Sequence, residues 1–354
     1  MIHTNSSDFN VSPSPASTEV SRVFRCVRLY AFMVLIFFAI SCKAANSPEE
    51  DETSDVAPRS LTNITETAGF SARYGHAAAV FGNALWVIGG YNNTTRFNDV
   101  YKSTDGNTWS QVTTSGTVFT ARSGHTVAVF NNALWVIGGY NNTTRFNDVY
   151  KSTDGNTWSQ VTTSGTVFTA RTGHTAAVFK GALWVIGGDT GSGIVNDVYK
   201  STDGSSWTLV TANAGFSARD SHTTAVFNDG SGEALWVIGG WSGSINNNNV
   251  YKSTDGSGWV AVTANAGFSA RSGHTTAVFN DGSGEALWVI GGWSGSKNND
   301  VWKSTNGIDW TSVTTGAVDF PGRNGHTTVV FDSALWTMGG DSGSSGIKND
   351  VWKY

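Results

Sequence analysis

The feature that most constrains this chain is a unit of about 50 residues that occurs six times in succession. Each unit opens on an arginine, and these are Arg73, Arg122, Arg171, Arg219, Arg271 and Arg323. The spacings between them are 49, 49, 48, 52 and 52 residues. A period of this size indicates a repeat array that folds as one body, although 354 residues could also hold two average domains.

Short apolar runs within each unit predict β-strands. In the first unit, His76–Phe81 and Ala84–Ile88 are two such runs joined by a Gly-Asn pair, and Gly89-Gly90 is expected to end the second. A third strand is expected over Asp99–Ser103, and an Asp-Gly turn then leads to a fourth that begins near Trp109. Each unit is therefore predicted to form a four-stranded antiparallel sheet.

The order of residues within the unit resembles the kelch repeat, in which a double glycine is followed by a spaced Tyr and Trp. Here the order is Arg-x-Gly-His, Leu-Trp-Val-Ile-Gly-Gly, Asn-Asp-Val-Tyr and then Trp, and the resemblance covers roughly residues 60–354. It implies that each unit is one blade of a β-propeller. Tyr101 to Trp109 is one residue longer than the usual kelch spacing, which affects only a hairpin tip. The 42 glycines and 14% charged residues also suit short strands joined by glycine turns.

The ends of the array predict how the ring closes. The sixth unit stops at Tyr354 without a fourth strand. Leu61–Thr65, at the start of the array, matches the fourth strand Trp207–Thr211 of another unit, with Leu61 in the tryptophan position. The first segment is therefore expected to complete the last blade and to leave no blade open. We predict an all-β, six-bladed propeller of the kelch type with four-stranded antiparallel blades.

Antiparallel alternation places the arginine turns and the loops after each double glycine on one face. The residues that follow the double glycines are Tyr91, Tyr140, Asp189, Trp241, Trp293 and Asp341, with Arg96 and Arg145 close behind the first two. Aromatic faces with planar amides suit sugars, and arginines hold carboxylates. We therefore take these residues, the six unit-opening arginines and Asp220 as candidate ligand-binding residues. Asp220 is the least expected residue at its turn.

Structural alternatives stand beside these candidates. Each unit-opening arginine could instead pair with the aspartate of its Asn-Asp-Val segment, although the fourth unit has Asn249 there. The post-glycine aromatics could equally pack over the loops below them. The six histidines at the repeat period, from His76 to His326, are expected to be structural, because ring-spaced side chains diverge and no metal site is predicted. Asp229–Glu233 could be an ordinary hairpin turn or part of a calcium loop.

The N-terminus has the pattern of an export signal. Three arginines precede the apolar run Leu29–Ile40, which is shorter than the roughly 20 residues that span a bilayer. Ala39-Ile40-Ser41-Cys42 resembles the lipobox of bacterial lipoproteins, which implies that Cys42 is acylated. An ordinary cleaved signal and an uncleaved anchor remain alternatives. We expect an export signal over residues 1–41, an acidic flexible tether over residues 42–58 and the propeller over residues 59–354.

Charge and cysteine content exclude several functions. The acidic tether holds five acids, which equal the whole net charge of −5, so the propeller is near neutral and unsuited to nucleic acid. Kelch propellers include galactose oxidases, whose copper site needs a cysteine crosslinked to a tyrosine, and the propeller has no cysteine. No cofactor is expected.

The function predicted from sequence is a non-catalytic binding module for a protein or a glycan on the loop face. We expect a monomer at the bacterial cell envelope, at the outer membrane or cell surface, held by its lipid anchor alone. One alternative is a sugar-processing enzyme that resembles the exported six-bladed sialic-acid mutarotases, with Asp189, Asp220 and Asp341 as candidate acids. The other is a purely structural or adhesive surface protein.

Overall fold

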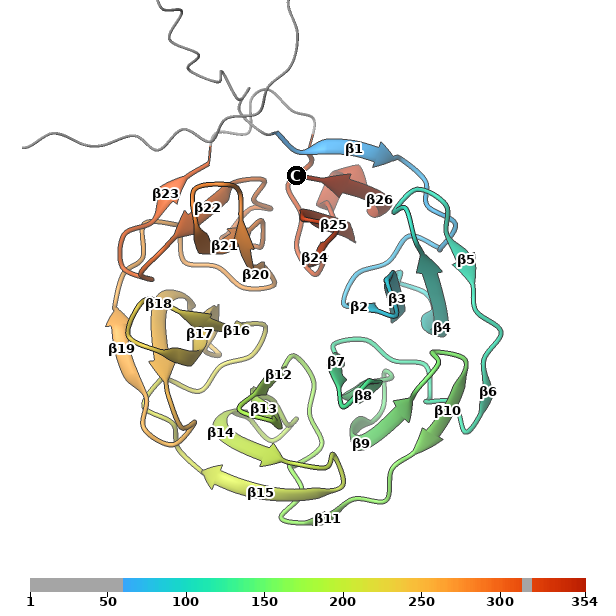
Figure 1. Ribbon diagram of the computed structural model, residues 1–354, viewed down its shortest axis with the longest axis horizontal. Coiled ribbons are helices and arrows are strands. Elements are labelled where there is room, and N and C mark those ends of the chain that lie inside the picture. Colours follow the sequence, from blue (N-terminus) through green and yellow to red (C-terminus); the bar gives the residue numbers. More distant parts are fainter. Residues whose placement is uncertain (1–59, 314–319) are drawn as a thin grey trace, which may run out of the picture. The chain divides into compact units, whose positions relative to one another are not determined.

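The computed structural model describes residues 60–313 and 320–354, which form a closed ring of six antiparallel blades (Figure 1). The predicted export signal, the tether and Cys42 lie outside the described residues. In the described part of the chain, no helix is long and apolar enough to cross a membrane. The helical content there is the three-residue 3₁₀ helix Gly343–Ser345.

The first three blades follow one another along the chain. Blade 1 contains β2 (Ala77–Phe81), β3 (Ala84–Tyr91), β4 (Arg96–Ser103) and β5 (Ser110–Gln111). Blade 2 contains β7 (Thr126–Phe130), β8 (Ala133–Tyr140), β9 (Arg145–Ser152) and β10 (Thr157–Gln160). Blade 3 contains β12 (Thr175–Phe179), β13 (Ala182–Asp189), β14 (Ile194–Ser201) and β15 (Ser206–Thr211).

The last three blades complete the ring, with the first strand of each blade nearest the axis (Figure 1). Blade 4 contains β16 (Thr223–Asn228), β17 (Glu233–Trp241), β18 (Asn246–Ser253) and β19 (Val260–Thr263). Blade 5 contains β20 (Thr275–Asn280), β21 (Glu285–Ile290), β22 (Val301–Ser304) and β23 (Thr311–Ser312). Blade 6 contains β24 (Thr327–Phe331), β25 (Ala334–Asp341), β26 (Ile347–Lys353) and β1 (Thr62–Thr65).

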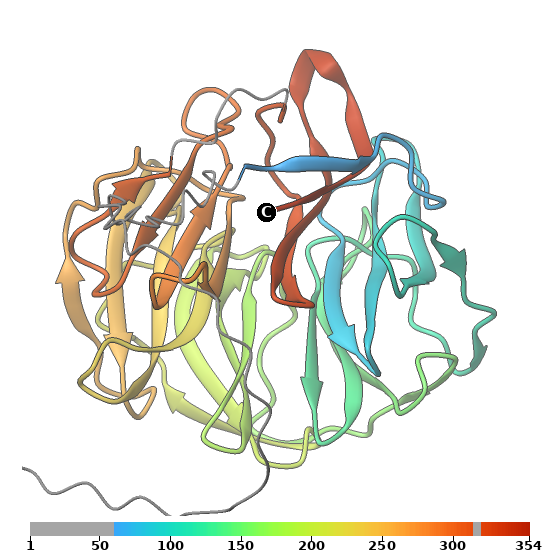
Figure 2. The ribbon, with the colours of Figure 1, turned by 45° about the horizontal axis from the view of Figure 1, so that its top comes forward.

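The closure predicted from sequence is confirmed. Strand β1 pairs with β26 in antiparallel register, with Thr62 opposite Lys353, so the N-terminal segment lies along the outer edge of blade 6 (Figure 2). Leu61 is 3% exposed and packs in the same cluster as Trp288 and Trp352. It therefore takes the packing role that a tryptophan has in other blades.

Blades 2 and 3 each carry a fifth strand that the sequence did not predict. These are β6 (Ser115–Gly116) and β11 (Ser164–Gly165), which pair in parallel with the outer strands β10 and β15. A Cβ on Gly116 would lie 2.4 Å from the carbonyl oxygen of Trp158, and its φ is +75°. Glycine thus allows the linker to lie directly on the blade edge.

The double glycine does not end the second strand in most blades, which corrects that expectation. Strand β3 runs through Gly89 and Gly90 to Tyr91, with a register shift between Ile88 and Gly90 that marks a β-bulge. A Cβ on Gly90 would approach the Cβ of His76 to 2.7 Å, so the bulge requires glycine. Only blade 5, whose following loop is one residue shorter, ends this strand at Ile290 before the glycines.

Tryptophans fill the spaces within and between the blades. The most buried of them, each under 2% exposed, are Trp158, Trp207, Trp236 and Trp288. Fourth-strand tryptophans meet a phenylalanine edge to face, as in Phe119–Trp158 with ring centroids 5.3 Å apart. Rigid blades of this kind hold their connecting loops in fixed positions.

Candidate functional site

The six unit-opening arginines are structural, which corrects their assignment as ligand-binding candidates. Their side chains are 0% exposed, so no ligand at the surface touches them, and they are Arg73, Arg122, Arg171, Arg219, Arg271 and Arg323. In blade 1, Arg73 donates to both carboxylate oxygens of Asp99 at 2.6 and 3.0 Å and to the carbonyl of Gly89 at 2.7 Å. The aspartate pairing that the sequence left open is therefore present.

Blade 4 departs from this arrangement at Asn249. Arg219 donates to the amide oxygen of Asn249 at 2.8 Å and to the hydroxyl of Ser217 at 3.0 Å, and it has no carboxylate partner in the part of the chain that the structure describes. Burial lowers the pKa of Arg219 from 12.5 to about 10. Four of the other five arginines pair with aspartates whose side chains are at most 16% exposed.

The exposed face of the loops is built from six clusters, one between each pair of successive blades; together we call them the rim. Each cluster contains a residue at or just before the third strand of one blade and two residues of the next blade, the one after the arginine and the one after the double glycine, which pair with each other in a β-bridge. The clusters, in ring order, are Arg96–Ser123–Tyr140, Arg145–Thr172–Asp189, Ile194–Asp220–Trp241, Asn246–Ser272–Trp293, Lys297–Asn324–Asp341 and Ile347–Tyr74–Tyr91.

Arg96 lies at the junction of blades 1 and 2 between two tyrosine rings. Its guanidinium carbon is 4.2 Å from the ring centroid of Tyr91 and 4.9 Å from that of Tyr140. Its nitrogens donate to the hydroxyl of Ser123 and to the amide oxygen of Asn142. Among the described residues it has no carboxylate partner, so the rings and neutral oxygens hold a positive charge that stays uncompensated.

The other two rim cations are each paired with an acid. Arg145 lies 2.6 Å from a carboxylate oxygen of Asp189, and Lys297 lies 2.6 Å from one of Asp341. Burial raises the pKa of Asp341, but the hydrogen bonds from Lys297 and from the Gly343 N–H outweigh it and leave that pKa lowered. Both acids are thus held as structural counter-ions between blades.

Asp220 is the rim acid that forms no ion pair among the described residues. It is half-buried, and burial raises the pKa of its carboxyl, as does the nearby charge of Asp189. Arg145 and the Ser221 hydroxyl oppose that shift. Asp220 therefore binds a proton more readily than an ordinary aspartate, whereas Asp341 binds one less readily.

The junction of blades 4 and 5 presents an aromatic surface. Trp293 is 39% exposed, and the amide nitrogen of Asn246 donates to its carbonyl at 3.1 Å. The amide oxygen of Asn246 is buried and has no hydrogen-bond partner among the described residues. Trp241 is half-buried one junction away, and Ile245 at the tip of its loop is 61% exposed. Trp293 is therefore available to a ligand, and Trp241 is available in part.

Sequence reasoning missed the rim residues Tyr74 and Lys297, whose partners lie elsewhere in the same unit and in the next unit, respectively. Tyr74 packs edge to face on Tyr91 with centroids 5.6 Å apart, and Lys297 bridges to Asn324 of blade 6. The signal that could have found them is variation within the repeat. The residue after each arginine differs between most units, while the histidine two positions further on is the same in all six.

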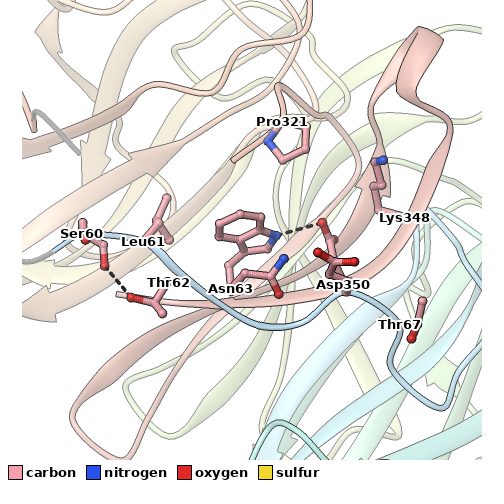
Figure 3. A pocket seen from close by; sticks show the side chains of 10 residues that line it. Ser60, Leu61, Thr62, Asn63, Thr67, Pro321, Lys348 and Asp350 are labelled. Atoms are coloured by element: carbon pink, nitrogen blue, oxygen red, sulfur yellow. Dashed lines mark hydrogen bonds between the residues drawn. The ribbon is translucent and has the colours of Figure 1, made fainter. Parts of the chain in front are cut away.

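Two other surfaces are less suited to binding a ligand. A groove of about 600 Å³ lies beside β1 and is lined by Lys348, Asp350 and Trp352 (Figure 3). It borders both breaks in the described chain, and the Asp350 carboxylate already accepts bonds from Arg323 and Trp352. The segment Asp229–Glu233 is a hairpin whose Asp229 oxygens accept from Lys252 and Ser231. Protein donors thus satisfy the oxygens that a calcium ion would need.

Comparison with known families agrees with this geometry. Residues 54–240, more than half of the 354-residue chain, match the family model described as the KLHDC2/KLHL20/DRC7 Kelch-repeats domain. No curated protein was found that matches the sequence. Kelch propellers commonly bind proteins. With its six blades and its latch strand β1, the chain belongs to the kelch-repeat family of β-propellers.

Proposed function

We propose that this protein is a non-catalytic binding module whose rim holds a partner protein through an acidic side chain of that partner. The observation that carries the proposal is the uncompensated charge of Arg96. The corresponding cations Arg145 and Lys297 are neutralised by aspartates of the next blade, whereas Arg96 meets only Ser123 and Asn142. A half-buried guanidinium flanked by aromatic rings is suited to bind a carboxylate.

The position of Arg96 supports a protein surface better than a catalytic site. Its two tyrosines belong to successive blades, so the flat faces of Tyr91 and Tyr140 can extend contacts along a peptide on both sides of the ion pair. Two of the three candidate acids, Asp189 and Asp341, already form ion pairs with cations of the protein. Among the described residues, that leaves Asp220 as the one candidate acid outside an ion pair.

The test uses matched pairs of synthetic peptides on an array probed with residues 59–354. In each pair, one member carries Asp or Glu and the other carries Asn or Gln at the same place. We expect the protein to prefer the acidic members and Arg96→Ala to lose at least tenfold in affinity for them, since a charge-assisted bond contributes about 1.5–3 kcal/mol.

The control for that variant is Lys180→Ala, which removes an exposed cation from the hairpin between β12 and β13 on the opposite face. It should leave binding unchanged. Equal binding of acidic and neutral peptides, or equal binding by the protein and Arg96→Ala, would contradict the proposed role of the rim.

A glycan is the second candidate partner, and Trp293 favours it. The exposed indole offers a stacking face to a sugar ring, and the amide nitrogen of Asn246 holds the Trp293 backbone in place by donating to its carbonyl. A glycan array probed with the protein, Trp293→Ala and Ile308→Ala tests this. Ile308 is 54% exposed on the opposite face, so only Trp293→Ala should abolish a hit.

We further propose that the protein is exported and anchored by a lipid at Cys42, which rests on the sequence of the leader alone. Cells that express the full chain would be fed a radiolabelled fatty acid, with Cys42→Ser as the control. Label in the protein and none in the variant supports the anchor. Label in neither, with both chains exported, means an ordinary cleaved signal if the exported chain is shortened and an uncleaved anchor if it is not.

A further inference from the structure

The axis of the propeller contains a channel whose lining differs between its two sides. A cavity of about 210 Å³ lies there, bounded by the histidines His76 and His125 and by the first two residues of every first strand. On blades 4, 5 and 6 these residues are all threonines, namely Thr223, Thr224, Thr275, Thr276, Thr327 and Thr328. On blades 1 and 2 they are Ala77, Ala78, Thr126 and Val127.

Each of the six histidines lies just before a first strand, and five of them share one hydrogen bond. In these five, Nε2 meets the threonine hydroxyl that opens the first strand of the preceding blade. The pairs are His76–Thr327 at 2.9 Å, His174–Thr126 at 3.2 Å, His222–Thr175 at 3.0 Å, His274–Thr223 at 3.0 Å and His326–Thr275 at 3.1 Å.

His125 is the exception, because the preceding blade has Ala77 in the threonine position. Its side chain is 5% exposed, and its Nε2 has no hydrogen-bond partner among the described residues. Val127, which corresponds to the threonine that would supply a second hydroxyl, is apolar. One buried ring nitrogen is therefore left facing the place where the five other junctions hold an oxygen.

The backbone around this gap is fixed. Six peptide N–H groups and carbonyls form a closed ring of hydrogen bonds about the axis, at 2.8–2.9 Å, through Gly75, Gly124, Gly173, Ser221, Gly273 and Gly325. Each histidine follows one of these residues directly. His125 is thus held in the same position as its five equivalents, and the gap cannot close by movement of one blade alone.

The charge state of His125 decides what the gap can take. Burial and the neighbouring Arg122 lower its pKa to about 3, with a small opposing effect of the Ile88 carbonyl, so the imidazole is neutral at pH 7. A neutral ring carries one N–H and one lone pair, and Nε2 is the donor or the acceptor according to the tautomer. A hydroxyl group both donates and accepts, so it matches Nε2 in either tautomer.

We propose that the axial channel has a binding site for one hydroxyl group, located between Nε2 of His125 and the methyl group of Ala77. A buried nitrogen without a partner is costly, and the missing threonine leaves room for an oxygen at bonding distance. The hydroxyl belongs either to an ordered water or to a small aliphatic alcohol whose carbon atoms contact Ala77, Ala78 and Val127. This site is independent of the rim.

The first experiment compares crystal structures, at a resolution that shows water, of the protein with Ala77→Thr and Thr126→Ala. We expect an oxygen about 2.8 Å from Nε2 of His125 in the protein. Ala77→Thr should replace it with the threonine hydroxyl and should fold, because threonine occupies this position in the five other blades. Thr126→Ala should create a second site of the same kind at His174.

A second experiment, independent of crystals, identifies the source of the hydroxyl. Long-range proton–nitrogen NMR reports the Nε2 shifts of the histidines during titration with 2-propanol. A His125 signal that moves with alcohol and is insensitive to it in Ala77→Thr assigns the site to an alcohol. A signal that stays fixed while the crystal shows an oxygen assigns it to water. No oxygen near Nε2 and no response to alcohol would overturn the proposal.

Discussion

The clearest test of the propeller's internal electrostatics is to give blade 4 the ion pair that it lacks. Asn249→Asp places a carboxylate 2.8 Å from the guanidinium of Arg219, where only an amide oxygen is present. Burial lowers the pKa of Arg219 from 12.5 to about 10, and at 1.36 kcal/mol per pKa unit the uncompensated charge costs about 3 kcal/mol. The new carboxylate should recover part of that cost.

The size of the gain follows from the other blades. The aspartates that occupy this position are 8% to 34% exposed, so water screens part of the attraction. We expect Asn249→Asp to increase the free energy of unfolding by about 1–2 kcal/mol, which raises Tm by about 2–5 °C for a domain of this size. Below about pH 3 the carboxyl protonates and the gain should disappear.

The matched control is the reverse change in blade 5. Arg271 has the same bonds as Arg219, to Ser269 and to a glycine carbonyl, and additionally both oxygens of Asp300. Asp300→Asn should therefore lower the free energy of unfolding by about 1–3 kcal/mol in urea denaturation at pH 7. If Asn249→Asp is neutral or destabilising while its near-ultraviolet circular dichroism is unchanged, the reasoning about Arg219 is wrong.

Three further predictions concern stability. The six channel histidines have pKa values of about 3 or well below 6.5, so the unfolded chain binds more protons as the pH falls through 6.5. Each histidine should lower the free energy of unfolding by about 1.4 kcal/mol at pH 5.5. The midpoint of urea denaturation should therefore fall steeply between pH 7.5 and 5.5. An unchanged midpoint would contradict the burial of these histidines as neutral rings. Gly106→Ala should lower the free energy of unfolding by about 2–4 kcal/mol, because the new methyl group would lie 2.0 Å from a tryptophan ring of blade 6. Its control is Gly82→Ala, which is also at positive φ but has no neighbouring atoms, and which should lower it by about 1 kcal/mol. Leu61→Ala should lower the free energy of unfolding by about 2–4 kcal/mol, because it leaves a cavity under the latch strand. Its control is Val260→Ala, at a position that is 63% exposed, which should change that free energy by less than about 0.5 kcal/mol. Equal effects would mean that the latch is not part of the core.

Much of the fold was predictable because the same local sequence pattern occurs six times. The Asp-Gly turns, the glycine pairs and the small residues of the first strands are local features, and their repetition averages out ambiguity in any one unit. The latch was predictable for the same reason, since Leu61–Thr65 matches a fourth strand that the sixth unit lacks. The end of the second strand was mispredicted, because the bulge at Gly89-Gly90 depends on its contact with His76.

The candidate site was predictable only in part. The residues after the double glycines do lie on the rim, but the six unit-opening arginines point inward, five of them to an aspartate 26 to 29 residues away and Arg219 to Asn249. Burial of a charged side chain cannot be read from the residues next to it in the sequence, because it depends on whether a partner on another strand folds over it. The aspartate of Asn-Asp-Val was the signal, and the structure shows it in five of six blades.

The repeated pattern is enough to predict the architecture: six units, four main strands to a unit and a ring closed by its own first segment. The chemistry of the rim and of the channel, in contrast, depends on contacts between blades. Arg96 acquires its tyrosine neighbour and its amide partner from the next blade, and His125 lacks its hydroxyl because the preceding blade has Ala77. Strand patterns are set within a unit, whereas binding surfaces of a propeller form between units. Their properties therefore emerge only when the ring is assembled.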